Sequence, residues 1–395
     1  MQCVVDITIE RMGEKGDGLS AGQAYPRTLP GETVSAAGKV IAPSPERVAA
    51  FCHVFATCGG CKLQHWRSEP YGVWKTELLA SALKARRIET EIKPLIDAHG
   101  AGRRRISLHV REIDGQWRSG FMAEGSHTLV PINICPILTP KLQDAPEIAA
   151  KFGNIFGDCD VAITLVDNGL DIAIKASRKL AEKAIAQFAP LMRDHGIARI
   201  AVNGETRAQE AVPMVHMGKA LVALPVGTFL QATALGEETL ATLIVGYAKK
   251  SKRVLDLFSG AGPFTFRLAE KCAVHAIDSD KPAIAAMQAA TRKLQGLKPI
   301  TAEVLDLFRN PYTPMDFKGF DAVVLDPPRA GAEAQCRNIA NSKLRRVIYV
   351  SCDVQSFARD AAVLVSEGFK LAEVTPVDQF KYSPHLEVVG LFTRS

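Results

Sequence analysis

From about residue 250 onward, short apolar stretches alternate with longer amphipathic ones. The apolar stretches are rich in β-branched residues, as in RVLDLF (253–258) and RRVIYVS (345–351). Helical patterns lie between them, for example KPAIAAMQAATRKL (281–294) and VQSFARDAAVLVSEG (354–368). Apolar strands that alternate with helices are typical of a parallel sheet with helices on both faces. This alternation predicts a doubly wound, Rossmann-like α/β fold for the C-terminal part.

The preceding residues divide into two further parts. Residues 1–44 hold short β-rich segments separated by glycine turns, as in GEKGDG (13–18). This pattern indicates either a small five-stranded barrel of the oligonucleotide-binding type or a plain β-hairpin extension. Residues 45–215 are mostly β in pattern and follow a proline-rich boundary, and residues 216–395 contain the α/β part. We therefore expect three domains with these bounds.

One helical segment interrupts the β-rich central part. Its pattern over residues 70–88 predicts an amphipathic helix whose buried side carries Val73, Leu78, Leu79 and Leu83. We expect the whole segment 70–98 to pack on the C-terminal α/β part.

Composition and charge limit the class of protein. The net charge of +6 over 395 residues permits a polyanionic partner without requiring one. No apolar run reaches the roughly 18 residues of a membrane span, and the N-terminus lacks the pattern of a secretion signal. We expect a cytoplasmic monomer without a membrane partner. The nine cysteines are then read as ligands, nucleophiles or packing residues rather than as disulfides.

A glycine loop follows the first strand of the α/β part, in VLDLFSGAGPF (254–264). Gly260 and Gly262 would let the backbone turn tightly and approach a ligand. Asp278 ends the next strand, where a carboxylate can bind the hydroxyls of a ribose. A dinucleotide-binding loop would carry a third glycine where Thr265 stands. The loop therefore favours S-adenosylmethionine (SAM), which has no phosphate.

Further reactive side chains follow the later strands. Asp326 begins a rigid Asp-Pro-Pro turn after one strand, and Cys352 follows the next strand just before a helix. A helix N-terminus favours a thiolate, so we expect a lowered pKa for Cys352. Glu387 and His385 alternate to one face of the last strand. Glu387 is a candidate general base, and His385 could orient it or the substrate.

Four cysteines form a candidate metal site. Cys52, Cys58 and Cys61 lie within ten residues, and Cys135 lies further along. Four thiolates suit zinc or an iron–sulfur cluster, and the spacing alone leaves both open. His53 and His65 flank this segment and are expected to be surface or core residues rather than ligands.

These stretches resemble the RNA uracil-5 methyltransferase family. The motifs are FLQAT (229–233), DLFSGAGPF (256–264), LDPPRAG (325–331), SCD (351–353) and HLE (385–387), in the family's order. The N-terminal GEKGDGLS with LPGE is similar to a TRAM domain, a small RNA-binding barrel. The cysteine segment is similar to the family's iron–sulfur segment, with Cys135 as fourth ligand. TRAM domain and cysteines together resemble the bacterial 23S ribosomal RNA branch, whereas the tRNA branch usually lacks both.

The resemblance implies a covalent mechanism. The Cys352 thiolate would add to carbon 6 of uracil, carbon 5 would take the methyl group of SAM, and Glu387 would remove the carbon 5 proton. It also implies a [4Fe–4S] cluster on the four cysteines. The residues that would contact SAM or the target base are Gln231, Phe258, Gly260, Asp278, Asp306 and Asp326.

An RNA substrate, expected to be 23S rRNA, would present its target uridine flipped or unpaired. Arg103, Arg104 and Arg105 are candidate phosphate contacts or a solvated charge run, and Phe229 could stack on the base or belong to the core. The family often has Asn where Pro263 stands, and Asn-Pro where Asp353 and Val354 stand. Three alternatives stay open. The first is a tRNA uracil-5 methyltransferase, and the second is a SAM-dependent methyltransferase that acts on another base or on protein, with Cys352 merely structural. The third is a methyltransferase-fold RNA-binding protein without this activity.

Overall fold

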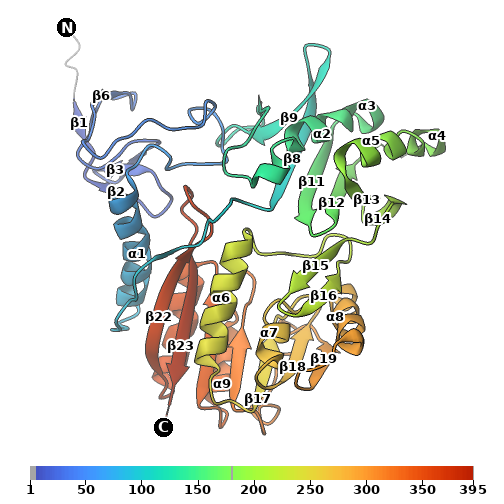
Figure 1. The fold of residues 1–395 in the computed structure, drawn as a ribbon. Coiled ribbons are helices and arrows are strands. Elements are labelled where there is room, and N and C mark those ends of the chain that lie inside the picture. Colours follow the sequence, from blue (N-terminus) through green and yellow to red (C-terminus); the bar gives the residue numbers. More distant parts are fainter. Residues whose placement is uncertain (1–5, 179–180, 395) are drawn as a thin grey trace.

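In the computed structural model, which describes residues 6–178 and 181–394, an eight-stranded sheet forms the C-terminal part (Figure 1). Its order is β19-β18-β17-β20-β21-β23-β22-β7. The strands are β7 (Ile96–Asp97), β17 (Arg253–Leu257), β18 (Ala273–Asp278), β19 (Ile300–Val304), β20 (Ala322–Leu325), β21 (Arg346–Ser351), β22 (Lys370–Asp378) and β23 (Glu387–Thr393). Neighbours are parallel except for β23, which is antiparallel to both β21 and β22. The predicted α/β fold is confirmed, and its sheet is mixed.

Helices cover both faces of this sheet because successive strand residues point to opposite sides. Val254 and Val324 pack toward one face, and Leu255 and Val323 toward the other. The first face carries α6 (Ala234–Tyr247), α7 (Thr265–Ala269) and α8 (Lys281–Lys293). The second carries α1 (Ser68–Ala85), α9 (Glu333–Ala340) and α10 (Val354–Ser366). All the strands whose ends carry candidate residues are therefore held from two sides.

Helix α1 departs from its prediction in two ways. Leu78, Leu79 and Leu83 are buried as expected, but Val73 is 58% exposed, because the buried side instead begins at Tyr71. The helix ends at Ala85, before the predicted residue 88, and does not continue through the segment to residue 98. Arg87 adopts a left-handed backbone (φ 58°) that directs the chain away. The residues that follow run along the sheet and end in β7.

A second, seven-stranded sheet lies above the first (Figure 1). Its order is β10-β9-β8-β11-β12-β13-β14, with β8 (Arg105–Ile113), β9 (Gln116–Met122), β10 (Leu129–Pro131), β11 (Cys159–Val166), β12 (Gly169–Ala176), β13 (Ile197–Val202) and β14 (Glu205–Gln209). The short helices of this region are η1 (Pro140–Leu142), α2 (Ala145–Lys151), α3 (Gly153–Phe156), α4 (Glu182–Ile185) and α5 (Phe188–His195). A hairpin of β15 (Met214–Met217) and β16 (Ala220–Ala223) packs against α8.

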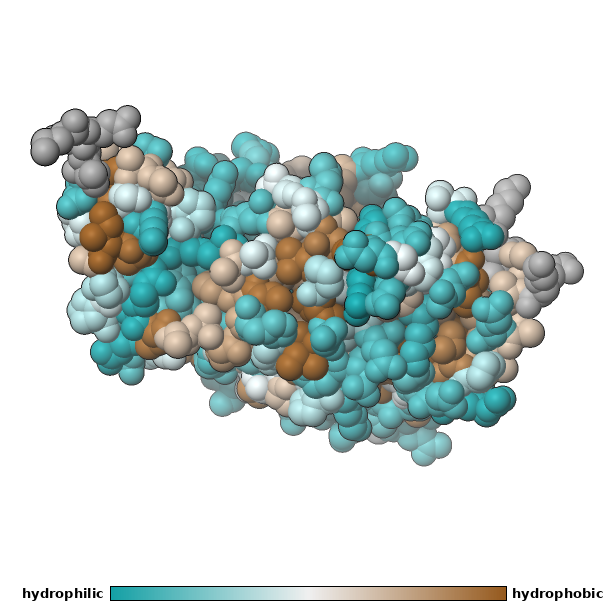
Figure 2. Space-filling view, turned by 90° about the horizontal axis from the view of Figure 1, so that it is seen from above, coloured by the Kyte–Doolittle hydropathy of each residue, from teal (hydrophilic) through white to brown (hydrophobic). Residues whose placement is uncertain are grey.

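Six short strands make up the N-terminal part. They form the three-stranded sheets β1-β5-β6 and β2-β3-β4, from β1 (Ile7–Thr8), β2 (Arg11–Met12), β3 (Gly18–Ser20), β4 (Gln23–Tyr25), β5 (Thr33–Val34) and β6 (Val40–Ala42). The five-stranded barrel stays a prediction. Hydrophobic residues gather in patches on the face shown in Figure 2, among mostly hydrophilic ones. No helix within residues 6–178 and 181–394 has the length and apolar character needed to cross a membrane.

Candidate functional site

A cavity of about 600 Å³ opens at the carboxyl ends of the parallel strands. Every residue predicted to be catalytic or to bind SAM lines it: Gln231, Phe258, Gly260, Asp278, Asp306, Asp326, Cys352 and Glu387. They come from segments spread over more than 150 residues of sequence. The carboxyl edge of an open α/β sheet gathers them because consecutive loops emerge there side by side.

The glycine loop forms one wall of the cavity. Gly260 and Gly262 have positive φ values of 54° and 99°, and a Cβ on Gly262 would lie only 3.0 Å from the Phe266 ring. The Asp278 carboxylate, at the end of β18, accepts hydrogen bonds from the backbone N–H of Gly260 (2.8 Å) and of Asp280 (2.8 Å). These bonds hold the carboxylate beside the loop, and its remaining lone pairs can still accept hydroxyl donors.

An aromatic pair closes the same end of the cavity. The rings of Phe258 and Phe308 lie 5.5 Å apart, and Phe308 is 53% exposed. Asp306 orients this segment, because its carboxylate accepts the backbone N–H groups of Phe308 (3.0 Å) and Arg309 (3.2 Å). Exposed aromatic rings beside a carboxylate can receive a flat heterocycle. The sequence analysis did not single out Phe308.

The opposite end of the cavity holds two carboxyl groups and a thiol. Burial raises the pKa of Glu387 to about 7, and Gln379 and Arg329 oppose that rise. Burial, followed by the charge of Glu387, raises the pKa of Asp326 well above its usual range. Burial also raises the pKa of Cys352 to about 11, with Glu387 and Asp326 adding to it.

The expected lowering of the Cys352 pKa is therefore wrong for this structure. The side chain of Asp353 caps α10 by accepting the backbone N–H groups of Gln355 (3.1 Å) and Ser356 (2.8 Å). These N–H groups are consequently not directed at the thiol. Asp353 thus has a defined local role even though it departs from the family pattern, and the helix still begins directly after Cys352.

The sequence analysis missed Gln379, which is completely buried. Its Nε2 donates to Oε1 of Gln231 (2.7 Å) and to Oε1 of Glu387 (3.0 Å). Gln231 in turn donates to Asp326 (3.4 Å). The reasoning applied to Asp278 would have found Gln379, because it too follows a buried strand, β22, at the same edge of the sheet.

His385 does not point at Glu387. Its ring nitrogens lie 2.9 and 3.1 Å from Nη2 of Arg329, and β23 begins only at Glu387, so the predicted strand alternation does not apply. Burial, then Arg329, lowers the pKa of His385 to about 4, so the imidazole is neutral near pH 7. Its ring bonds to Arg329, a cavity-lining residue, and within the described residues it makes no hydrogen bond to Glu387.

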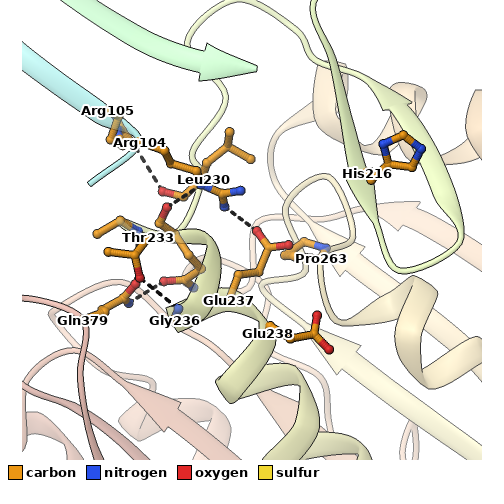
Figure 3. A network of polar contacts seen from close by, with 12 residues as sticks. Arg104, Arg105, His216, Leu230, Thr233, Gly236, Glu237, Glu238, Pro263 and Gln379 are labelled. Atoms are coloured by element: carbon orange, nitrogen blue, oxygen red, sulfur yellow. Dashed lines mark hydrogen bonds and ion pairs between the residues drawn. The ribbon is translucent and has the colours of Figure 1, made fainter. Parts of the chain in front are cut away.

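The three consecutive arginines have different surroundings. The side chain of Arg104 is only 12% exposed and pairs with Glu237 (2.5 Å), so it is not available to a phosphate (Figure 3). Glu237 also pairs with Arg267 (3.2 Å), which donates to the carbonyl oxygen of Pro263 (2.7 Å). The buried Glu237 therefore links the start of the central sheet to the glycine loop. Pro263 contributes a carbonyl oxygen to this network, whatever its side chain does.

Arg103 and Arg105 instead line a groove of about 440 Å³ beside the cavity. Arg105 lies over the ring of Phe229 (5.5 Å), and Arg103 over the ring of Phe380 (5.9 Å). Phe229 is 65% exposed, so it is not a core residue. Phe229 and Phe380 line the cavity as well, so groove and cavity are continuous.

All four predicted ligand cysteines line a second, smaller cavity of about 60 Å³. Burial raises the pKa of Cys58, Cys61 and Cys135, and each is raised further by other thiols of this set. Within the described part of the chain, no group of three or more Cys, His, Asp or Glu side chains is gathered closely enough for a single metal ion. His53 is exposed and His65 is buried, and neither lines this cavity.

Known protein families and sequences are similar to this chain. The family described as tRNA (Uracil-5-)-methyltransferase matches residues 222–395. An uncharacterized RNA methyltransferase of Caulobacter vibrioides is 45% identical over 413 residues, covering 98% of this chain and 100% of that one. A 23S rRNA (uracil(1939)-C(5))-methyltransferase of Pseudomonas savastanoi is 31% identical over 431 residues, covering 98% and 94%.

The chain belongs to the RNA uracil-5 methyltransferase family. The predicted enzyme class, a SAM-dependent RNA methyltransferase, is confirmed at this level. The crystal structure of Pyrococcus abyssi tRNA (uracil-54, C5)-methyltransferase with S-adenosyl-L-homocysteine has a TM-score of 0.78, at 21% identity and 98% and 99% coverage. The two proteins therefore share their fold over nearly the whole of this chain.

Proposed function

We propose that this member of the family methylates carbon 5 of a uridine in ribosomal RNA through a covalent bond to Cys352. The observation that supports this most is the single cavity that holds a thiol, two carboxyl groups of raised pKa and a glycine loop with its carboxylate. A pyrimidine at the thiol end and a nucleoside at the loop end would face each other across it.

Cys352, as thiolate, forms a bond to carbon 6 of the uracil and makes carbon 5 nucleophilic. SAM, when bound, supplies the methyl group that carbon 5 takes. Glu387 then removes the proton from carbon 5, the bond between sulfur and carbon 6 breaks, and the thiolate is restored. Because the pKa of Glu387 lies at about 7, this carboxyl can take and return a proton near neutral pH.

We assign SAM to the loop end of the cavity. Asp278 is oriented to accept ribose hydroxyls, and Phe258 and Phe308 with Asp306 form the adenine end. Gly260 allows close backbone approach, and Gln231 and Asp326 lie toward the thiol end.

For the RNA we propose 23S rRNA, with the target uridine flipped or unpaired. The 31% identical relative named for 23S rRNA covers nearly the whole chain. Residues 1–44 would form the TRAM-like RNA-binding domain, 45–215 the iron–sulfur domain and 216–395 the methyltransferase domain. Arg103, Arg105 and Phe229 would hold the strand beside the target base, since basic and aromatic side chains together suit single-stranded RNA.

The four-cysteine cavity would hold a [4Fe–4S] cluster. Four free thiols around one small cavity fit a four-thiolate ligand set. Cys135 would tie the central sheet to the segment of Cys52, Cys58 and Cys61, a structural or RNA-positioning role. Protein purified without oxygen should carry iron and a broad visible absorption band, and zinc without that band would contradict the cluster.

Covalent trapping tests the proposed chemistry. RNA with 5-fluorouridine cannot lose a proton from carbon 5, so it should remain attached to the enzyme through Cys352 in the presence of SAM. Cys352→Ala should form no adduct on a denaturing gel, whereas replacement of the buried Cys272 by Ala should still form it. A methyltransferase-fold RNA-binding protein without this activity would bind RNA and SAM without adduct or turnover. Mapping 5-methyluridine in rRNA and tRNA from a deletion strain separates the two RNA substrates.

A further inference from the structure

Gln379 makes three hydrogen bonds inside the wall of the cavity. Its Oε1 accepts from the backbone N–H of Ala232 (3.1 Å), and its Nε2 donates to Gln231 and to Glu387. A backbone N–H can only donate, so the Ala232 contact fixes which end of the amide is oxygen. The amino group must then face Gln231 and Glu387.

The orientation of the Gln379 amide in turn determines how Gln231 and Glu387 are hydrogen-bonded. Oε1 of Gln231 is used as acceptor, so its Nε2 is the end that reaches Oδ2 of Asp326 (3.4 Å). On Glu387, Oε1 receives a donated hydrogen, which leaves Oε2 as the oxygen able to carry a proton.

The neighbouring packing keeps Gln379 in place from two directions. Asp378, one residue before it, is held by the hydroxyl of Tyr71 (2.7 Å) and the ammonium of Lys75 (3.1 Å) from α1. On the other side, a Cβ on Gly236 of α6 would lie only 2.6 Å from Oε1 of Gln379. Only a residue without a side chain fits there while the amide keeps this position.

We propose that Gln379 is a positioning residue of the methyl-transfer reaction, which directs the exchangeable proton of Glu387 to Oε2 and turns the N–H of Gln231 toward Asp326. The inference deepens the proposed function and rests on it. Gln379 does not itself line the cavity and acts through Glu387 and Gln231.

A consequence follows for proton removal from carbon 5. The hydrogen bond from Gln379 stabilises the charged form of Glu387 and opposes the effect of burial. Without this donor, Glu387 would hold its proton to a higher pH, and less of the enzyme would carry a free base at a given pH. Resolution of the covalent adduct should therefore slow more than its formation.

The test compares Gln379→Met with Gln335→Met, using the full-length protein. Gln335 is also buried, but both ends of its amide bond to the backbone of Tyr312, which does not line the cavity, whereas Gln379 bonds to the lining residues Gln231 and Glu387. Methyl transfer to uridine-containing RNA and the enzyme–RNA adduct are both followed as a function of pH. In Gln379→Met the acidic limb of kcat should move up by about one pH unit, and adduct should accumulate. Gln335→Met should keep the wild-type profile.

An unshifted profile in folded Gln379→Met, or an equal shift in both variants, would overturn the inference. If Gln379→Met does not fold, Gly236→Ala gives the second measurement: it should displace the amide and move the limb in the same direction, and an unmoved limb refutes the proposal. A wild-type enzyme that forms no 5-methyluridine on any RNA would overturn the proposed function, and the inference with it. If the wild-type enzyme is active but the acidic limb of the variant's kcat profile does not move, the inference about Gln379 is wrong while the proposed function stands.

Discussion

Asp256 is a completely buried carboxyl group beneath the glycine loop. One oxygen accepts a hydrogen bond from the hydroxyl of Thr265 (2.5 Å), and Oδ1 has no partner in the described structure. Burial raises the pKa of Asp256 to about 7. The folded state thus keeps a proton on this group over a pH range in which the unfolded chain, with a pKa near 3.8, has released it.

The contribution of Asp256 to the free energy of unfolding should therefore decrease as pH rises from about 4 to about 7. A raised carboxyl pKa favours folding fully below the unfolded value, and this contribution is lost as pH rises through the folded value. Asp256→Asn should make this decrease smaller, because a neutral amide replaces the titrating group. Denaturant unfolding at several pH values measures it. Asp114→Asn, in an exposed turn, is the matched control and should leave the pH dependence unchanged.

At this scale the sequence identified the reactive residues but not their electrostatics. Motifs at strand ends led to Asp278, Asp326, Cys352 and Glu387, because loop position follows from strand order. The Cys352 pKa was predicted in the wrong direction, since it depends on burial and on residues distant in sequence. Gln379 was missed because glutamine carries no chemistry of its own.

Helix α1 connects the N-terminal half of the chain with the loop beside the cavity. Lys75 lies in it without solvent exposure and donates to Asp378 (3.1 Å) and to the carbonyl oxygen of His385. Burial lowers the pKa of Lys75, and Asp378 opposes this. One helical side chain thus fixes both ends of the loop that separates β22 from β23.

Removal of this ammonium should be costly. Lys75→Met leaves the Asp378 carboxylate buried with Tyr71 as its remaining side-chain donor, and should lower the free energy of unfolding by about 3 kcal/mol. Lys93→Met removes one side of an exposed pair with Glu91 and should cost under about 1 kcal/mol. Urea unfolding compares the two. Equal losses of unfolding free energy in the two variants would show that the buried ion pair stabilises the protein no more than the exposed pair does.

Helices and strands could be predicted from the sequence where the local pattern of apolar residues determines them. Most of the alternating strands and helices after residue 250 were found because strands such as β20 and β21 are almost continuously apolar. Strand β19 was missed because it is short and largely exposed. The end of α1 was placed too late, since the backbone conformation of Arg87 has no signal in sequence. Strand β7 is too short to recognise, and its pairing with β22 depends on tertiary contacts.

Considered as a whole, the molecule places a basic, aromatic groove between its two large sheets. Arg104, expected to contact RNA, is occupied by Glu237, whereas Arg105 faces the groove over Phe229. Which arginine of a consecutive run is available depends on packing between parts of the chain. This could not be read from the sequence.

Arg105→Gln should weaken RNA binding and reduce its dependence on salt. Loss of one contact to a single-strand phosphate should lower the slope of log K against log salt by about 0.7. Arg292→Gln, an equal charge change on the exposed side of α8, serves as control. Titration of RNA at several salt concentrations measures both slopes. A slope unchanged by Arg105→Gln would exclude a phosphate contact there.

Strand β7 and helix α1 belong to the first hundred residues, yet they complete the sheet of the last two hundred. A recombinant fragment cut at residue 216 would leave β22 with a bare edge and Asp378 without its cation. Unpaired strand edges promote self-association. The transferase half of this protein is therefore a poor choice for expression by itself, and any swap of modules with a relative would have to carry both early segments along.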